Sequence, residues 1–321
     1  MLNNRSQYLV ILVATYNRLG LLKRTLDSIV SGTKCSYEII VIDGGSTDGT
    51  IEYLKTHSEV TPVFQGKLLG TARCYNEVWR QIDSQYTCWL SDDTEIVGGS
   101  LDLAVHILES NPGIGLVGLK MKDTQGPQKD EPYLGAISEY GIINCNHGVL
   151  STRLLRAVGY FNESYRSYTI DPDLTASVLC AGKTVVLTKR VTVLHHREWV
   201  EQERDDKVVR EKGGIDNQSI YREKFKFLQA SNGMLIRLRA RVGYYLTYYV
   251  LFFHADPDSL RLGLNIRDWL NLSGGRFVSL MDPVRSRKHP YHLVQKVPGQ
   301  LLGVPDNPYR HLLPDTSEGG L

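Results

Sequence analysis

The sequence lacks a long apolar run, a CxxC pair and any marked excess of one charge. No apolar run reaches the roughly 18 to 20 residues that a membrane-spanning helix needs, and the first one is too short and too early for a signal peptide. With 37 basic and 35 acidic residues, the formal net charge of +2 gives no reason to expect a nucleic-acid partner. These absences predict a cytoplasmic protein that does not bind nucleic acid.

The five cysteines are odd in number and lie far apart in the sequence. They are Cys35, Cys74, Cys88, Cys145 and Cys180. This spacing argues against a disulfide framework and against a zinc site made of thiolates, and it indicates a reducing compartment. The chain has 321 residues, 42% of them hydrophobic, which is enough to bury a sizeable core.

The first half of the chain alternates β-branched runs with amphipathic stretches. Strands are predicted at residues 8–14, 37–42, 60–64, 86–90 and 114–121, and helices at 21–31, 46–56, 71–82 and 100–109. This alternation predicts an α/β fold, a mostly parallel sheet with helices on both faces. Such sheets bind ligands at the carboxyl ends of their strands, so the polar residues just after each strand are the first candidates for a site.

A second αβ section follows a looser stretch. Helices are predicted at 152–157 and 171–181, strands at 141–144, 184–187 and 192–195, and a charged helix at 199–212. Gly213 and Gly214 then mark a predicted boundary between a domain of residues 1–214 and a mainly helical C-terminal region of residues 215–321. In that region the aromatic run 242–253 follows several arginines. It suits either a helix on an anionic membrane surface or a core helix that packs on the sheet, and an oligomer contact is a further alternative.

Carboxylates follow two of the predicted strands. Asp43 begins a glycine-rich turn, where it is placed either to accept the imide N–H of uracil or thymine or to cap the turn before the helix expected at Ser46. Asp92 and Asp93 are adjacent, and two such charges at a buried strand end favour a bound Mg²⁺ or Mn²⁺. A solvated acidic turn is the alternative for this pair.

Two further candidates lie in the second section. Asp171 and Asp173 flank Pro172 at the start of a predicted helix, so one of them suits a general base for an acceptor hydroxyl or a plain helix cap. His195 and His196 end a predicted strand. Either histidine suits a third metal ligand, a phosphate donor or a structural role, and the sequence does not choose between them.

Together these residues resemble the family 2 glycosyltransferases with the A-type (GT-A) fold, a Rossmann-like nucleotide-binding sheet. The resemblance covers residues 7–200 and lies in 13–18 (VATYNR), 41–50 (VIDGGSTDGT), 89–96 (WLSDDTEI), 159–163 (GYFNE), 171–174 (DPDL), 181–182 (AG) and 193–196 (VLHH). The order and spacing of these pieces are more specific than any one of them.

The resemblance implies a role for each candidate. Asp171 matches the catalytic base with Asp173 supporting it, while Asp93 and His195 match the metal ligands. The donor-binding positions are Thr15, Tyr16, Asn17, Asp43, Gly44, Asp92 and Asp173. The implied cofactor is Mn²⁺ or Mg²⁺, and the implied reaction is a single inverting displacement at the anomeric carbon.

The sequence departs from the family pattern at four positions. Ser91 replaces the first acid of a strict DxD, Ile170 replaces a glutamate before the base, and Gly44 and Val178 replace an asparagine and an arginine. None of these changes removes a group that the mechanism requires.

The sequence therefore predicts a glycosyltransferase that moves a sugar from a UDP- or dTDP-sugar to a hydroxyl on a saccharide or lipid-linked acceptor. Surface polysaccharide or glycolipid synthesis is expected by analogy with the family. A nucleotidyltransferase would carry a basic, glycine-rich phosphate loop near the first strand, and an oxidoreductase a GxGxxG there, but residues 15–21 are neither. A non-catalytic nucleotide-sugar-binding scaffold is the other alternative, although it would be expected to lack Asp93 or Asp171.

Overall fold

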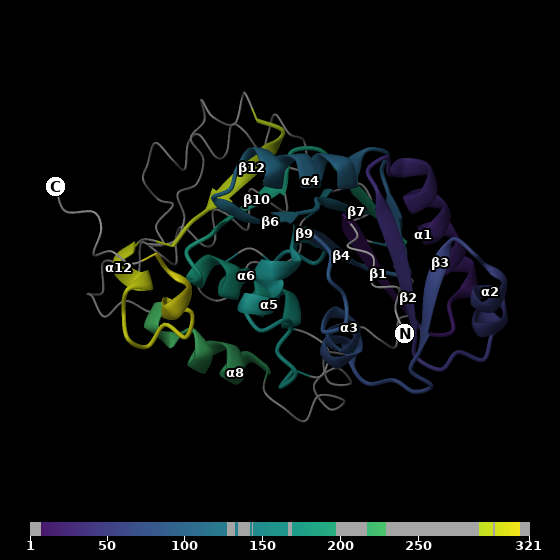
Figure 1. Cartoon of the computed structure of the whole chain (residues 1–321), viewed down its shortest axis with the longest axis horizontal. Coiled ribbons are helices and arrows are strands. Elements are labelled where there is room, and N and C mark those ends of the chain that lie inside the picture. Colours follow the sequence, from purple (N-terminus) through teal and green to yellow (C-terminus); the bar gives the residue numbers. More distant parts are fainter. Residues whose placement is uncertain are drawn as a thin grey trace.

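A computed structural model describes residues 8–126, 132–133, 142, 144–165, 169–196, 217–228, 289–297 and 299–314 (Figure 1). The strands are β1 (Leu9–Thr15), β2 (Tyr37–Asp43), β3 (Val60–Phe64), β4 (Tyr86–Ser91), β5 (Thr94–Ile96), β6 (Ile114–Gly118), β7 (Met121–Asp123), β8 (Pro132–Tyr133), β9 (Gly148–Ser151), β10 (Thr184–Thr188), β11 (Val193–His195) and β12 (Tyr291–Gln295). The helices are α1 (Leu19–Gly32), α2 (Thr50–Thr56), α3 (Thr71–Trp79), α4 (Ser100–Ser110), α5 (Thr152–Ala157), α6 (Ile170–Cys180), α8 (Asn217–Lys224) and α12 (Gly299–Leu302), with short 3₁₀ turns η2 (Lys226–Leu228) and η3 (Arg310–Leu312).

The main sheet has the strand order β12-β10-β6-β9-β4-β1-β2-β3. Strands β3, β2, β1 and β4 pair in parallel, and β6 pairs in parallel with β10, while β9 and β12 run antiparallel to their neighbours. The predicted α/β fold with a mostly parallel sheet is therefore confirmed.

Both faces of this sheet are covered by helices. Side chains alternate along β1, so that Leu9, Ile11 and Val13 face one core and Val10 and Leu12 face the other. The first core is closed by α1, α2 and α4, and the second by α3, α5, α6 and α8, on opposite sides of the sheet in Figure 1. This accounts for the continuous apolar sequence of β1, since a strand buried on both faces needs no polar side.

A small second sheet, in the order β5-β11-β7-β8, lies at the end of the main one. Strand β11 runs antiparallel to β5 and parallel to β7, and these pairings set His195 opposite both Thr94 and Asp123. Because β5 begins one residue after Asp93, the small sheet carries the histidine strand to the acidic pair.

Two local predictions were wrong. Helix α2 begins at Thr50 rather than Ser46, because Gly45 and Gly49 adopt positive φ angles of 94° and 93° that no helix continues through. The section before residue 152 contains the antiparallel strand β9, which we had not predicted; of the strand expected at 141–144, the two described residues, 142 and 144, are not in a strand.

The described segments beyond residue 214 pack on the rest of the protein. Strand β12 pairs with β10 at the edge of the main sheet, and Tyr221, Phe225 and Tyr309 join the core under α6. The predicted boundary at 213–214, the charged helix at 199–212 and the aromatic run at 242–253 all lie outside the described residues. Among the helices that are described, none has the length and apolar character required to cross a bilayer.

A buried ion pair joins α6 to α8. The Lys224 Nζ atom lies 2.6 Å from Asp173 Oδ1, and the Asp173 side chain is only 1% exposed. The Tyr165 hydroxyl donates to Asp173 Oδ2 at 2.8 Å, and Ser177 Oγ lies 2.6 Å from the Tyr309 hydroxyl. This network fixes α6 against segments far along the chain.

Replacing Lys224 with methionine should lower the free energy of unfolding by about 3 kcal/mol, because a buried carboxylate loses its cation. Chemical denaturation measures this difference. Lys226→Met is the matched control, since Lys226 is exposed and solvent screens its pair with Glu223, so this variant should leave stability nearly unchanged. The double variant Asp173→Asn/Lys224→Met should recover part of the loss; equal instability of the single and double variants would contradict this explanation.

Candidate functional site

The carboxyl ends of three neighbouring strands bring the predicted site residues together. In the sheet register Thr15 lies beside Asp43, and Ala14 lies beside Ser91. The first, second and fourth strands thus deliver their polar loops to one edge, as the strand pattern of the sequence predicts.

Asp43 caps its own turn with one oxygen and leaves the other without a partner. Its Oδ1 accepts hydrogen bonds from the amides of Gly45 at 2.9 Å and Ser46 at 3.0 Å. Its Oδ2 is buried and has no hydrogen-bond partner in the described part of the protein. A buried acceptor without a partner is costly, so this oxygen is placed to receive an N–H from a ligand.

An apolar surface lies beside Asp43. Tyr16 and Leu68 are 42% and 65% exposed, which is unusual for large hydrophobic side chains. A Cβ atom added at Gly44 would lie 2.9 Å from Leu68 Cδ2 and 3.6 Å from Tyr16 Cδ2, so both side chains border this glycine. An asparagine at position 44, as is usual in the family, would require the exposed Leu68 side chain to move.

Asn17 joins two loops of the site. Its Oδ1 accepts a hydrogen bond from the Thr47 amide at 2.7 Å, and its own amide donates to Ser46 Oγ at 2.9 Å. Its φ of 54° is in the left-handed region that asparagine tolerates. The side-chain oxygen of Asn17 therefore holds the loop that follows Asp43. The hydroxyl of Ser46 accepts from the Asn17 backbone amide instead of capping a helix.

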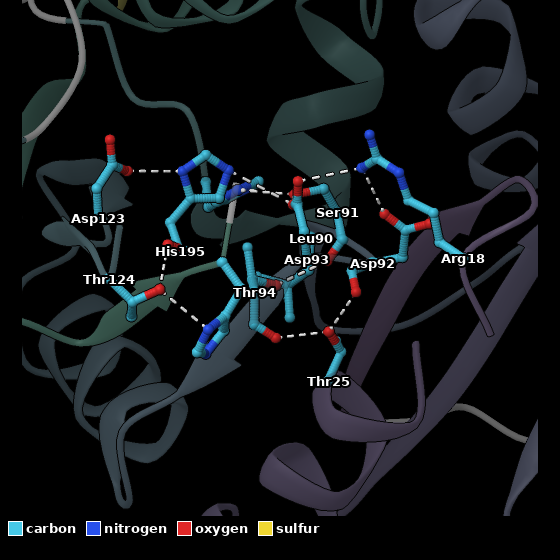
Figure 2. Close-up of polar contacts among 12 residues, drawn as sticks. Arg18, Thr25, Leu90, Ser91, Asp92, Asp93, Thr94, Asp123, Thr124 and His195 are labelled. Carbon is cyan, nitrogen blue, oxygen red and sulfur yellow. Dashed lines mark hydrogen bonds and ion pairs between the residues drawn. The ribbon is translucent and has the colours of Figure 1, made fainter. Parts of the chain in front are cut away.

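The acidic pair is buried and held from several directions (Figure 2). Asp92 and Asp93 are 4% and 7% exposed. Asp92 Oδ2 accepts a hydrogen bond from Thr15 Oγ1 at 2.8 Å, and Asp93 Oδ1 accepts one from Ser91 Oγ at 2.5 Å. Arg18 Nη1 bridges the pair, 3.3 Å from Asp92 Oδ1 and 3.2 Å from Asp93 Oδ2. Ser91, which stands where a strict DxD has an acid, thus orients Asp93.

The structure separates the two histidines. His195 Nε2 lies 3.5 Å from Asp93 Oδ1, and its Nδ1 lies 2.8 Å from Asp123 Oδ1. His196 instead contacts Glu95 Oε2 through Nε2 at 2.8 Å. In Figure 2, His195 and Arg18 approach Asp93 from opposite sides, with Asp123 beyond the imidazole. Of the two histidines, His195 is the one that borders the acidic pair.

The charges in this cluster shift one another's pKa values. Burial raises the pKa of Asp92 to about 6, against the lowering effect of the Arg18 charge and the hydrogen bond from Thr15. Burial also acts to raise the pKa of Asp93, but the hydrogen bond and charge of His195 outweigh it and hold that pKa well below its usual range. Burial disfavours the imidazolium of His195, yet its bonds to Asp123 and Asp93 raise its pKa to about 9. Asp93 is therefore the carboxylate that stays ionised.

Sequence reasoning missed a third histidine at this site. His147 is buried, with Nδ1 3.2 Å from the Trp89 carbonyl oxygen and Nε2 3.5 Å from Ser91 Oγ. Burial, followed by the charge of His195, lowers its pKa to about 4, so its imidazole is neutral. The one local signal for His147 is its position directly before strand β9, and the sequence pattern does not mark β9 as a strand.

The cluster fits a divalent cation only as a partial site. Within the described residues no group of three or more His, Cys, Asp or Glu side chains is arranged to hold a metal ion. Asp93 nevertheless offers an oxygen, and His195 on a neighbouring segment offers a nitrogen once metal binding releases its Nε2 proton, a pair that suits Mn²⁺. Mg²⁺ and Mn²⁺ sites in nucleotide enzymes typically use one or two carboxylates and complete their shell with substrate phosphates and water. The residues present fit that type of site.

Asp171 lies on the first turn of α6. Burial raises its pKa to about 8, and a hydrogen bond with the Trp89 side chain opposes this rise. The preceding Ile170, which replaces the family's glutamate, is buried in the core and contributes no charge there. Burial raises the pKa of the Tyr75 phenol, which donates to the Leu90 carbonyl at 2.6 Å, and the charges of Asp92 and Asp171 add to this rise. Tyr75 therefore lies within electrostatic reach of both carboxylates.

Asp173 does not join these residues. Both of its oxygens are engaged in the ion pair with Lys224 and the hydrogen bond from Tyr165 described above. The assignment of Asp173 to donor binding is corrected accordingly. Asp173 lies two residues after Asp171 on the helix, so its side chain projects to a different side, where it fixes α6 in place. Val178, the departure further along α6, is likewise buried in the core.

Comparison with known proteins agrees with this geometry. The sequence model described as Glycosyl transferase family 2 matches residues 10–166. An uncharacterized glycosyltransferase of Rickettsia typhi is 22% identical over 54% of this chain and 58% of its own length. An uncharacterized glycosyltransferase of a Nostoc species is 21% identical over 42% of this chain and 47% of its own. The matches thus span less than two thirds of the length of these curated relatives.

Two solved structures share the fold. One is S. aureus TarS (residues 1–349) in complex with UDP-GlcNAc, with a TM-score of 0.56 at 14% identity over 83% of this chain and 79% of that one. The other is the mannosyltransferase PcManGT from Pyrobaculum calidifontis in complex with GDP-Man and Mn²⁺, with a TM-score of 0.52 at 19% identity over 83% and 76% of the two chains. At these identities the similarity establishes the GT-A fold.

Proposed function

Because this chain belongs to the family 2 glycosyltransferases, we propose that it transfers a sugar from a UDP- or dTDP-sugar to an acceptor hydroxyl by a metal-dependent, inverting displacement. The observations that carry this proposal are two functions at one sheet edge and a third on α6. At the sheet edge, Asp43 has a buried oxygen without a hydrogen-bond partner among the described residues, and Asp93 is an ionised carboxylate. On the first turn of α6, Asp171 is a carboxyl group of raised pKa.

The donor is proposed to lie across the ends of β2, β1 and β4. The free Oδ2 of Asp43 would accept the imide N–H of uracil or thymine, while Tyr16 and Leu68 offer apolar contact to the ring. Guanine also presents N–H donors, so the preference for a pyrimidine rests on a single acceptor flanked by two apolar side chains. The diphosphate would then reach the acidic pair, which is next along the sheet.

The metal, when bound, would be held by Asp93 and His195 and would stabilise the charge of the leaving diphosphate. Asp123 would orient His195 through the hydrogen bond at Nδ1, leaving Nε2 toward Asp93. Such outer contacts fix the ring and its tautomer. The PcManGT complex shows that a protein of this fold binds GDP-Man with Mn²⁺.

Asp171 is proposed to be the general base. Its carboxylate would take the proton of the acceptor hydroxyl while the acceptor oxygen bonds to the anomeric carbon and the bond from that carbon to the diphosphate breaks. The displacement is single, so the configuration at the anomeric carbon inverts. A saccharide or lipid-linked acceptor, a role in surface polysaccharide or glycolipid synthesis, a cytoplasmic location and a membrane-surface contact of the C-terminal region extend this proposal by analogy with the family alone.

Calorimetric titration with a panel of nucleoside diphosphates and their sugars, with and without Mn²⁺, tests the proposal. We expect Mn²⁺-dependent binding of UDP or dTDP species, and weaker binding of GDP, ADP and CDP species. A preference for GDP would refute the assignment of a pyrimidine base to the Asp43 pocket, but it would leave the proposed glycosyltransferase activity in place. Failure of every nucleotide to bind would favour the alternative of a non-catalytic scaffold.

The activity should rise with pH between about 6 and 8. A raised pKa keeps Asp171 protonated, and so unable to accept a proton, at lower pH; activity is gained as the pH rises through a pKa of about 8. A nearby divalent cation would lower this midpoint and cannot raise it. The pH profile of kcat at saturating donor and Mn²⁺ measures the effect, with donor affinity followed at each pH to separate the titration of Asp92. A flat or falling profile over this range would contradict the assignment of Asp171.

A further inference from the structure

Arg18 occupies a position at the acidic pair that the proposed mechanism does not use. It is the N-cap residue of α1 and directly follows the loop at the end of β1. One of its guanidinium nitrogens lies within 3.3 Å of Asp92 and 3.2 Å of Asp93, while 38% of its side chain is exposed. A cation on a long, partly exposed side chain thus neutralises two carboxylates that are almost fully buried.

Both oxygens of Asp93 are already engaged. Oδ1 accepts from Ser91 and borders His195, and Oδ2 contacts Arg18. Oδ1 carries both Ser91 and His195, so a divalent ion would bind through Oδ2, where the guanidinium of Arg18 repels it and must move away. His195 is 13% exposed and is held from behind by Asp123, whereas Arg18 reaches in from the more exposed side. Arg18 is the group that can leave.

Displacing Arg18 by a metal ion alone is unfavourable. The guanidinium would lose its two carboxylates and would remain near a divalent cation of the same sign. A diphosphate changes this balance, because it brings negative charge for both cations and offers the forked oxygen geometry to which arginine binds.

We propose that Arg18 couples metal binding to donor binding: it neutralises Asp92 and Asp93 in the empty site and yields Asp93 to the metal only when a nucleoside diphosphate arrives, to which the guanidinium then binds. This inference rests on the proposed metal-dependent function. It assigns to Arg18 a positioning role that neither Asp93 nor His195 fulfils.

The coupling has a thermodynamic signature. Mn²⁺ alone should bind the protein weakly, UDP alone should bind weakly, and each should strengthen the other by the same factor, because linkage between two sites is reciprocal. Calorimetry with Mn²⁺ alone, UDP alone and UDP at saturating Mn²⁺ gives this factor for the full-length protein. We expect it within the roughly 5- to 150-fold range typical of coupled sites.

The variant Arg18→Met should bind Mn²⁺ alone at least about fivefold more tightly than the wild type, and its coupling factor should fall to the part that direct attraction between the metal and the diphosphate supplies. A role in folding alone would not tighten metal binding. Arg18→Lys, which keeps the charge but not the forked donors, should keep Mn²⁺ binding weak. Lys23→Met is the matched control: it removes one positive charge from the same helix, where Lys23 lies over the Tyr53 ring, and should leave both quantities unchanged.

The outcomes separate this inference from the function on which it rests. Absence of Mn²⁺-dependent UDP binding in the wild type would overturn both. Normal coupling in the wild type, with unchanged Mn²⁺ affinity and coupling in Arg18→Met, would overturn the role of Arg18 and leave the proposed function standing. If Arg18→Met does not fold, Arg18→Gln provides the same comparison, and tighter Mn²⁺ binding in the Lys23→Met control would overturn the specific assignment.

Discussion

Replacing Asp171 with asparagine should lower turnover by about 10²- to 10⁴-fold and leave the affinity for UDP and Mn²⁺ within about twofold of the wild type. Asparagine has nearly the same shape but cannot accept the acceptor's proton. The donor pocket at Asp43 and the acidic pair lie on the strand ends rather than on α6, so their geometry should persist. UDP release in the presence of acceptor measures turnover, and calorimetry measures donor binding.

The control for this variant is Asp83→Asn. The Asp83 side chain is 80% exposed and makes one long contact with Arg156, so its loss should change neither quantity. Near-normal turnover of Asp171→Asn would remove Asp171 from the role of base. If donor affinity fell together with turnover, the cause would be a shift of α6 rather than loss of the base. Measuring both quantities therefore separates these two explanations.

Replacing Asp93 with asparagine should abolish the Mn²⁺-dependent part of UDP binding and lower turnover by about 10³-fold or more. The substitution removes the carboxylate that remains ionised in the cluster, and a metal contributes several kcal/mol of transition-state stabilisation, with each 1.36 kcal/mol worth about tenfold in rate. Calorimetry with and without Mn²⁺ gives the first quantity, and UDP release gives the second.

Glu95→Gln is the matched control for Asp93. Glu95 lies two residues further along the chain and contacts His196 rather than His195, so its charge can be removed without touching the proposed ligands. We expect Mn²⁺-dependent binding to survive in this variant. Loss of Mn²⁺ dependence in Glu95→Gln with its retention in Asp93→Asn would transfer the metal assignment from His195 to His196.

The sequence predicted the fold, and the meeting of several candidate site residues at one edge of the sheet, for a specific physical reason. The buried parallel strands read as continuous apolar runs, and the positions where they end mark one edge of the sheet, so Thr15, Asp43 and the Asp92–Asp93 pair could be expected to meet there. Local patterns carried this information.

Other features depended on contacts that no local pattern encodes. Asp123 and His147 reach the cluster through strands β7 and β9, whose places in the sheets follow from tertiary packing. The pairing of Asp173 with Lys224 spans 51 positions of sequence, so the spacing around Pro172 alone suggested a catalytic support. The start of α2 was misplaced because Ser46 has the chemistry of a cap, although its hydroxyl is used by Asn17.

The closing strand β12 makes the order of synthesis important for this protein. Strand β10 is complete by residue 188, yet among the described residues its outer edge is paired by residues 291–295, about a hundred positions later. Until then the growing sheet presents an unpaired row of backbone donors and acceptors, the kind of edge that invites pairing between chains. Completion of this edge therefore depends on a contact between distant parts of the chain, which slows the step and lengthens the time in which the edge can pair with other chains.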